Sequence, residues 1–353
     1  MADTVRVLVV DDSAYMRVVL KDILESDGAL TVLDTAKNGL EAVEKVKALA
    51  PDVVLLDIQM PKMDGLATLQ RIMKDNPTRV VMLSAMDKLD DQLPLRALSM
   101  GAVDFISKPS GPVSIDIVRF KSRIIEIVRN AALARLEPLR KARAPLPHKL
   151  TAPPACMPRN SDWKAVVIGA STGGPRALET IFAALPGNLQ VPMFIVQHLP
   201  SEFADSFAKR LDAARGPKVV VAKDGDRVTK GIAYLAPGGK HLVLESHSPA
   251  APIIRLDDSE PVQYVKPSVD VLFESAANCF GDHTLGVVLT GMGSDGVRGS
   301  RTIKSSGGKV IVQDEASSVI FGMARGVVNA GAADLVLPLE DIPNEIIRFM
   351  EVR

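Results

Sequence analysis

Short apolar runs alternate with amphipathic stretches along the first third of the chain. The apolar runs have the length of strands, although the second is weaker than the others: Val5–Val10, Val32–Ala36, Val53–Leu56, Val80–Leu83 and Val103–Ile106. The stretches between them space their apolar residues as helices do: Met16–Glu25, Leu40–Leu49, Leu66–Lys74 and Leu93–Met100. Strands that are buried on both faces read as continuous apolar runs. The pattern therefore predicts an α/β domain over residues 1–125, with a five-stranded parallel sheet covered by helices.

A second alternation predicts another α/β domain over residues 161–349, with a doubly wound, mostly parallel sheet. Its strands are expected at Ala165–Ile168, Met193–Val196, Val219–Val221, Ala233–Leu235, Leu285–Leu289 and Lys309–Val312. Its helices include Pro175–Ala184, Ser201–Ala214 and Val269–Cys279, and the region around His241–Leu256 has the pattern of a hairpin. The length of 353 residues agrees with two domains of roughly 150 residues each.

The composition changes over residues 126–160, where six prolines and seven basic residues accompany two acidic ones. The part up to about Arg143 can continue a helix, and the proline-rich remainder predicts a linker. A basic arm that binds nucleic acid is the alternative for this segment. It is disfavoured because no aromatic residues are interleaved with the basic ones.

Charge and cysteine content exclude several classes of protein. Lys and Arg number 42 and so do Asp and Glu, so no overall basic field attracts nucleic acid or an anionic membrane. Cys156 and Cys279 form no CxxC pair, which argues against a zinc or disulfide framework and fits a reducing compartment. No signal peptide is evident, and no apolar run approaches the ~20 residues of a membrane span. We therefore expect a cytoplasmic protein without nucleic acid or direct membrane insertion.

Polar residues follow four of the predicted strands of the first domain. Asp11 and Asp12 follow the first strand, Asp57 the third, Ser84 the fourth and Lys108 the fifth. The carboxyl ends of the strands form the ligand crevice of a doubly wound sheet. Three carboxylates that converge there repel one another unless a cation is present, and their oxygens suit Mg²⁺. Lys108 and Ser84 can then hold the oxygens of a phosphoryl group that arrives at Asp57.

Two further expectations concern this crevice. The Lys108–Pro109 peptide is expected to be cis, because the lysine must turn back into the site. Helix capping is the alternative role for these polar residues, Asp12 and Ser13 especially. Capping is disfavoured because polar residues at successive strand ends are hard to explain by caps alone.

Five motifs in the first domain share a family resemblance: Val9-Val-Asp-Asp-Ser13, Leu56-Asp57-Ile-Gln-Met-Pro61, Met63-Asp-Gly65, Leu83-Ser-Ala85 and Phe105-Ile-Ser-Lys-Pro109. Together they resemble the response-regulator receiver family. The resemblance implies a flavodoxin-like fold and phosphorylation of Asp57 by a partner histidine kinase. It implies Mg²⁺ held by Asp12, Asp57 and the backbone carbonyl of Gln59, with Asp11 assisting. Ser84 and Phe105 match the switch pair of the family.

The second domain places a serine on a glycine-rich turn. An apolar strand leads into Gly169-Ala-Ser171-Thr-Gly-Gly-Pro175, and Pro175 opens the next helix. A hydroxyl in this position lies beside backbone N–H groups and the positive end of a helix dipole. Such a place suits a nucleophile whose attack creates an oxyanion. An ordinary turn, or an anion site without chemistry, is the alternative.

A serine nucleophile needs a base, and the base needs an orienting acid. His198 is the preferred base because it follows a strand and so lies at the sheet edge, in contrast to the other histidines of this domain, which are His241, His247 and His283. A second glycine turn after a strand supplies Asp295 as the acid. The N–H groups of Thr172 and Met292 are expected to face the oxyanion.

The same turn also fits another class of site. Gly291-Met-Gly293-Ser-Asp-Gly296 matches GxGxxG after a strand, and Asp314 and Glu315 lie about twenty residues further on. This is the pattern of a dinucleotide-binding βαβ unit. Asp295 disfavours it, because a carboxylate inside the loop opposes the pyrophosphate that the glycines are meant to receive.

Six stretches of the second domain share a second resemblance: Gly169-Ala-Ser-Thr-Gly-Gly-Pro175, Val196-Gln-His198, Ala236-Pro-Gly-Gly239, Lys266-Pro-Ser-Val-Asp-Val-Leu-Phe273, Leu289-Thr-Gly-Met-Gly-Ser-Asp-Gly296 and Gln313-Asp-Glu315. They resemble the CheB-type chemotaxis methylesterase family, whereas the order Ser, His, Asp differs from that of α/β-hydrolases. The resemblance implies hydrolysis of γ-glutamyl methyl esters on the cytoplasmic helices of methylated chemoreceptors, with deamidation of receptor glutamines as a related activity. No cofactor is expected in the catalytic domain. Ala324 departs from the proline expected at its position.

A switch domain joined to a hydrolase predicts regulation. We expect the unphosphorylated first domain to cover the serine edge of the second, and phosphorylation of Asp57 to expose it. One alternative is a response regulator whose second domain only binds a partner or DNA, although no helix-turn-helix with a basic face is evident. Another is a hydrolase that acts on a protein ester outside chemotaxis.

Overall fold

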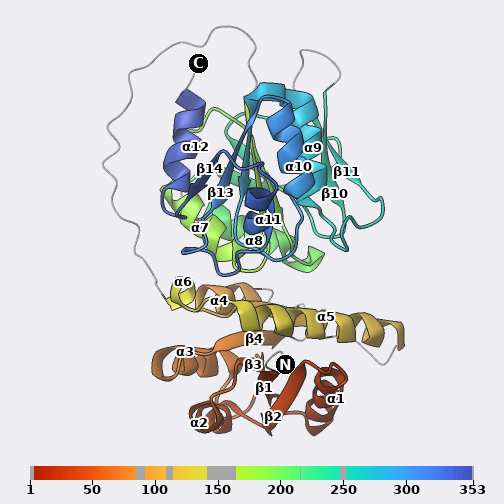
Figure 1. The fold of residues 1–353 in the computed structure, drawn as a ribbon, viewed down its shortest axis with the longest axis vertical. Helices are drawn as coiled ribbons and strands as arrows, with labels where there is room; N and C mark the ends of the chain where they lie inside the picture. The colour runs from red at the N-terminus through yellow and green to blue at the C-terminus, as the bar shows by residue number, and fades with distance from the viewer. Residues whose placement is uncertain are drawn as a thin grey trace. The chain divides into compact units, whose positions relative to one another are not determined.

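The structure, a computed structural model, describes residues 4–84, 92–108, 114–140, 164–214, 216–246 and 252–351. The chain divides into two compact units, Met1–Ala142 and Arg143–Arg353, and both are α/β units (Figure 1). None of the helices in the described ranges is both long enough and apolar enough to cross a membrane. The predicted fold class is confirmed in both units.

The first unit is a five-stranded sheet in the order β2-β1-β3-β4-β5, and each of its strand pairs is parallel. Helix α1 packs beside α5, and α2 packs beside α3. Because helices cover both faces, β3 is buried along its whole length. The strands are β1 (Val5–Val10), β2 (Leu30–Ala36), β3 (Val53–Asp57), β4 (Arg79–Ser84) and β5 (Asp104–Ser107). The helices are α1 (Ala14–Glu25), α2 (Gly39–Leu49), α3 (Gly65–Asp75), α4 (Leu93–Ser99), α5 (Ser114–Leu133) and α6 (Glu137–Arg140).

The second unit is built on a seven-stranded sheet in the order β14-β13-β12-β6-β7-β9-β8. Its strand pairs are parallel. The strands are β6 (Ala165–Ala170), β7 (Met193–Gln197), β8 (Lys218–Val221), β9 (Ile232–Leu235), β12 (Thr284–Val288), β13 (Lys309–Gln313) and β14 (Leu335–Leu337). The helices are α7 (Gly174–Ala184), η1 (Ser201–Phe203), α8 (Ala204–Asp212), α9 (Val269–Phe280), η2 (Gly281–His283), α10 (Val297–Ser305), α11 (Met323–Asn329) and α12 (Ile342–Glu351).

The pattern of apolar residues missed one strand and identified one hairpin. Strand β14 has three residues, of which Leu335 and Val336 are exposed, so it lacks the buried run that marks the other strands. The expected hairpin is formed by β10 (His241–Glu245) and β11 (Ile253–Asp257), which pair in an antiparallel manner as a separate sheet. The hairpin packs against α9.

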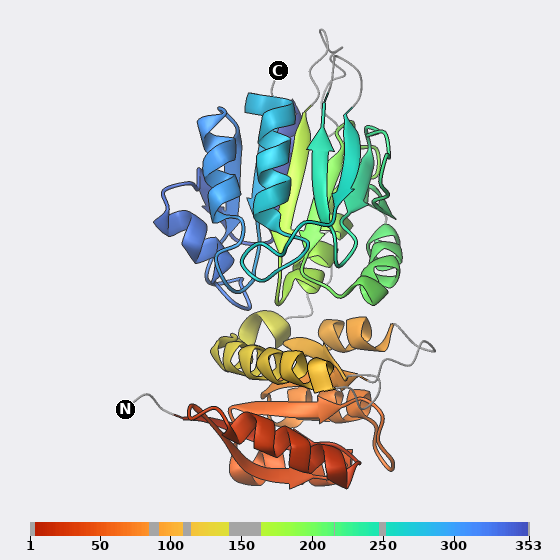
Figure 2. The same ribbon diagram turned by 90° about the vertical axis from the view of Figure 1, so that its right-hand side faces the viewer.

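In each sheet there is one place where the chain changes the side on which it adds strands. This reversal of strand order determines where a site can form. Strands β7, β9 and β8 lie in this order on one side of β6, whereas β12, β13 and β14 lie in this order on its other side. Because crossovers are right-handed, helices on the two sides of the reversal cover opposite faces. Accordingly α7 packs with α8, while α10 packs with α9 and α11 (Figure 2). The carboxyl ends of β6 and β12 then border a crevice, as do those of β1 and β3 in the first unit.

We expect Phe194→Ala to destabilise the second unit strongly. The Phe194 side chain is fully buried, and its ring centroid lies 5.7 Å from that of Tyr234 and 6.3 Å from that of Phe280. The cavity left by the ring should lower the free energy of unfolding by about 3–5 kcal/mol, measured by urea denaturation. Leu335→Ala, at an exposed position, should change it by about 0.5 kcal/mol or less. Equal effects of the two substitutions would contradict this account of the core.

Candidate active site and acidic crevice

Ser171 lies at the reversal of strand order in the second unit. It directly follows β6, its N–H donates to the Thr290 carbonyl at 3.1 Å, and its own carbonyl accepts from Gly174 N–H at 2.7 Å. Gly173 adopts φ of 80°, which closes this turn and starts α7. The serine is therefore held at the N-terminus of a helix of eleven residues, where the helix dipole favours developing negative charge.

Asp295 is a buried carboxylate that four donors surround. Its oxygens accept from the Ser268 hydroxyl at 2.8 Å and from the N–H groups of Val269 and Asp270 at 2.7 and 2.9 Å. His198 provides the fourth contact, with its Nε2 at 2.9 Å from Asp295 Oδ2. Burial raises the pKa of Asp295, but these hydrogen bonds outweigh burial and hold the pKa below its usual value. The carboxylate is therefore ionised at neutral pH, at the N-terminus of α9.

His198 occupies the equivalent position on the strand next to that of the serine. Ala170 and Gln197 are register partners at the ends of β6 and β7, and the His198 N–H donates to the Ala170 carbonyl at 3.1 Å. Ser171 is thus the first residue after β6, and His198 is the first residue after the neighbouring parallel strand β7. Because Asp295 accepts at Nε2, the neutral ring carries its proton there, and Nδ1 is left as the basic nitrogen.

Glycine allows the second turn to come close to the nucleophile. A Cβ atom at position 291 would lie 2.8 Å from Ser171 Cβ and 3.1 Å from Ser171 N, so no other residue fits there without displacement. The next residue is Met292, and within the described ranges its N–H donates to no backbone carbonyl. Ser171 and Gly291 therefore lie against each other. The two predicted oxyanion donors, Thr172 and Met292, are the next residues along the chain from each of them.

Three buried polar residues connect the ends of the strands around the serine turn. They lie in or beside the sequence motifs, but the sequence alone predicts no role for them. Gln197 Nε2 donates to the Ser171 carbonyl at 2.9 Å. Thr290 Oγ1 donates to the Thr172 carbonyl at 3.0 Å, and Thr290 N–H donates to Gln313 Oε1 at 2.8 Å. The available signal for Gln197 and Gln313 was a hydrophilic residue at the end of a strand, directly after its apolar run.

In the structure, the acidic residues on which the dinucleotide alternative depends are engaged in other contacts. Asp314 Oδ1 accepts from both the N–H and the hydroxyl of Ser317 at 2.9 and 2.6 Å, so it closes its own turn. Glu315 pairs with Arg325 at 3.1 Å. Asp295, inside the glycine loop, is held by His198 and the start of α9. Among the other histidines, His241 is buried and accepts from Ser268 N–H, while His247 lies outside the described residues.

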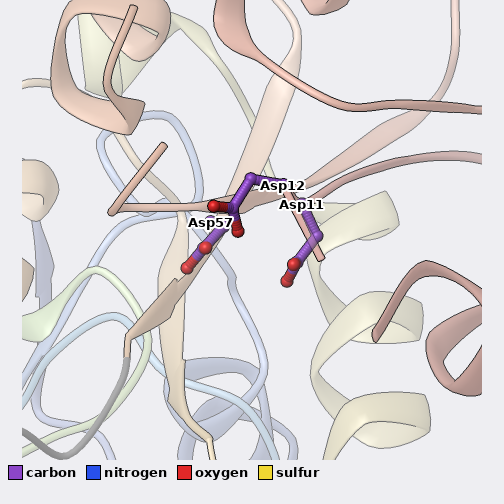
Figure 3. A group of neighbouring side chains, drawn as sticks. All are labelled: Asp11, Asp12 and Asp57. Atoms are coloured by element: carbon purple, nitrogen blue, oxygen red, sulfur yellow. The ribbon is translucent and has the colours of Figure 1, made fainter. Parts of the chain in front are cut away.

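The predicted acidic cluster of the first unit is present. One carboxylate oxygen each from Asp11, Asp12 and Asp57 lie within 4.8 Å of one another, and the three side chains gather at one end of the sheet (Figure 3). Asp11 and Asp57 are buried and Asp12 is exposed. Clustered carboxylate oxygens match the donor set that Mg²⁺ prefers, with open positions left for water. The residues present therefore fit this ion.

Lys108 is the cation that faces the cluster. Its Nζ lies 2.8 Å from Asp11 Oδ2 and 2.9 Å from Asp57 Oδ1. Burial is the main cause that raises the pKa of Asp57 to about 6; the charges of Asp11 and Asp12 add to the rise, and Lys108 opposes it. A Cβ at position 65 would collide with the Asp57 carbonyl, which explains the glycine of the Met63-Asp-Gly65 motif. The capping alternative applies to Ser13, whose hydroxyl accepts from Met16 N–H, and not to Asp57.

The remaining residues of the first unit are placed as follows. Ser84 ends β4 and is half-buried, and Gln59, two residues after Asp57, is exposed. Phe105 is buried in β5. The expected cis peptide at Lys108–Pro109 lies outside the described residues, because Pro109 is not among them.

Comparison with known proteins adds to this geometry. A family model of the CheB methylesterase matches residues 166–346, and one of the response regulator receiver domain matches residues 7–117. A protein-glutamate methylesterase/protein-glutamine glutaminase of Geobacillus kaustophilus is 44% identical over 349 residues, covering 98% of this chain and 99% of that one. Its namesake from Pyrococcus abyssi is 43% identical over 350 residues, covering 99% and 94%. The crystal structure of the Thermotoga maritima CheB methylesterase catalytic domain is 42% identical, with a TM-score of 0.52, and covers 53% of this chain and 98% of that one.

We expect Asp57→Asn to stabilise the metal-free protein at neutral and alkaline pH. The raised pKa means that ionising the buried carboxyl weakens folding as the pH rises from about 4 through about 6. One pKa unit corresponds to about 1.4 kcal/mol, so the neutral amide should gain as much as ~3 kcal/mol above that range. The difference should vanish as the pH falls below about 4, where the carboxyl is protonated in both the native and the unfolded state.

Thermal unfolding in metal-free buffer across this pH range is the measurement. Asp75→Asn, at the exposed end of α3, is the control and should show no such pH-dependent gain. A stabilisation of Asp57→Asn that is equal at both ends of the range would contradict the assigned cause.

Proposed function

Since this chain belongs to the CheB methylesterase family, we propose that it hydrolyses glutamate γ-methyl esters on the cytoplasmic helices of chemoreceptors, under control of its receiver domain. The enzyme is a carboxylic ester hydrolase, and its relatives are also named protein-glutamine glutaminases. The observation that carries the proposal is the contact of His198 with ionised Asp295, one strand away from Ser171.

The proposed reaction proceeds through an acyl-enzyme. Ser171 Oγ attacks the γ-carbonyl carbon of the ester while His198 Nδ1 takes the hydroxyl proton. The C–OCH₃ bond then breaks, and the same proton leaves with methanol. Water attacks the acyl-serine by the same proton path, which regenerates the hydroxyl and releases glutamate. A glutamine side chain would follow these steps with ammonia as the leaving group.

Two devices stabilise the charges that develop in this scheme. Asp295 stays ionised and holds the His198 ring in one tautomer, so the imidazolium forms beside a negative charge. The N–H groups of Thr172 and Met292 face the oxyanion, and each such donor contributes roughly 3 kcal/mol to lowering the barrier. We propose no cofactor for these steps, because serine, imidazole and carboxylate supply the nucleophile, base and orienting charge.

The receiver domain is proposed to accept a phosphoryl group on Asp57 from a chemotaxis histidine kinase. Asp11, Asp12, Asp57 and the Gln59 backbone carbonyl would hold Mg²⁺, which neutralises charge on the transferred group when it is bound. Lys108 contacts the Asp57 carboxylate and can pair with a phosphoryl oxygen.

Phosphorylation is proposed to act through the switch pair. Ser84 would bond the phosphoryl group, and Phe105 would change its packing in response. Removal of the receiver from the serine edge would then expose the catalytic site. A chain that begins at residue 151 should be more active than the unphosphorylated full chain. Equal or lower activity of the truncated chain would overturn inhibition by covering.

Methanol release from methylated receptor membranes tests the activity. Wild-type enzyme should release methanol, a phosphodonor with Mg²⁺ should increase the rate, and Ser171→Ala should abolish it under both conditions. Asp57→Asn should keep the basal rate and lose the stimulation. Hydrolysis of small esters without any release from receptors would direct the search to a protein ester outside chemotaxis.

We expect Asp295→Asn to lower kcat by roughly 10³–10⁴-fold with little change in KM. The amide cannot stabilise the imidazolium, and it does not enforce the proton on Nε2. Steady-state methanol release measures the effect. Asp282→Asn, at an exposed position, is the matched control and should retain wild-type kcat. A loss of less than tenfold in Asp295→Asn would argue against its role in orienting His198.

A further inference from the structure

Residues 262–265 form a tight turn of an uncommon kind. Val262 and Val265 exchange two backbone hydrogen bonds of 3.1 and 3.0 Å and pair as an isolated antiparallel bridge. The two residues between them, Gln263 and Tyr264, have φ of 51° and 66°. A two-residue turn with positive φ at both central positions is the type I′ turn, which favours Asn-Gly. Glutamine and tyrosine are both strained in this conformation.

Gln263 connects this turn to the catalytic carboxylate. Its Nε2 donates to Asp270 Oδ2 at 3.0 Å, and its Oε1 accepts from the Ser294 hydroxyl at 2.6 Å. Ser294 directly precedes Asp295, and the N–H of Asp270 donates to the Asp295 carboxylate at 2.9 Å. The strained turn is thereby attached to the loop that supplies the acid of the site.

Tyr264 makes no comparable contact with the residues that the structure describes. Its side chain is 100% exposed, whereas the other exposed large apolar residues described in the second unit range from 37% to 45%. The base of the loop is well held, since Lys266 Nζ bonds the Asp258 carboxylate at 3.0 Å and the Ser259 carbonyl at 3.1 Å. The chain therefore keeps a strained conformation that projects an aromatic ring into solvent, with no packing gain for the fold.

We propose that Tyr264 is a docking residue that contacts the polypeptide carrying the scissile side chain. This inference rests on the proposed function and extends it to recognition of the substrate protein. A protein substrate must lie across the edge that holds Ser171, and the turn at Gln263 is joined to that edge through Ser294 and Asp295. A rigid, amphipathic tyrosine ring supplies contact area at low entropic cost, as at other protein interfaces. Since the ring does not contact the reacting atoms, it governs binding and not the chemical step.

Tyr264→Gly separates docking from a structural role, because glycine relieves the strain at positive φ and removes the ring. The full-length variant should unfold at the same temperature as wild type or at a higher one. On methylated receptor membranes, we expect KM to rise about tenfold with kcat unchanged. On a capped single-residue glutamate γ-methyl ester, kcat/KM should equal that of wild type. Tyr264→Phe should restore most of the receptor KM, and Leu335→Ser should change neither substrate.

Each result has a separate meaning for the two proposals. A receptor KM within twofold of wild type in Tyr264→Gly would overturn docking and leave the proposed function intact. A parallel loss on both substrates would also overturn docking, since the turn would then act on the catalytic loop. Wild-type enzyme that cleaves the small ester but not the receptor would overturn the proposed function, and docking of that substrate with it.

Discussion

Both sites of this protein depend on the same constraint, the reversal of strand order in a doubly wound parallel sheet. Because crossovers are right-handed, the helices on the two sides of the reversal cover opposite faces of the sheet. The loops that follow the two strands at the reversal therefore separate at the carboxyl ends of these strands. In the first unit the reversal lies between β1 and β3, where Asp11, Asp12 and Asp57 gather. In the second it lies between β6 and β12, and the turns after those strands bring Ser171 against Gly291.

The electrostatics of the two crevices differ although their topology is the same. In the second unit, donors from α9 and His198 surround one buried carboxylate, and they lower the pKa of Asp295 despite its burial. In the first unit, two buried carboxylates share one lysine, and burial raises the pKa of Asp57. A fully bonded charge suits a group that must stay ionised. An incompletely compensated carboxylate cluster suits a site completed by a cation.

Much of the site followed from local sequence, and the rest did not for a physical reason. Ser171, His198 and Asp295 could be selected because each follows an apolar run, and a strand end in a parallel sheet lies at the crevice. Ser268 follows no such run, and Thr290, although it directly follows one, has a role that depends on a distant partner. Ser268 contributes through a contact with Asp295, 27 residues away, and Thr290 through Thr172, 118 residues away. Spacing along the chain carries no information about such pairs.

The sequence by itself determined that there are two α/β units, which strands are buried, and which polar residues end those strands, because hydrophobic periodicity and glycine-rich turns are local properties. The tertiary structure decided the strand order, the ring nitrogen of His198 that faces Asp295, and the pKa directions of Asp57 and Asp295. It also decided that Gln263 and Tyr264 adopt strained conformations beside the site. These features depend on which distant groups meet and how much water they exclude, which only the packed chain establishes.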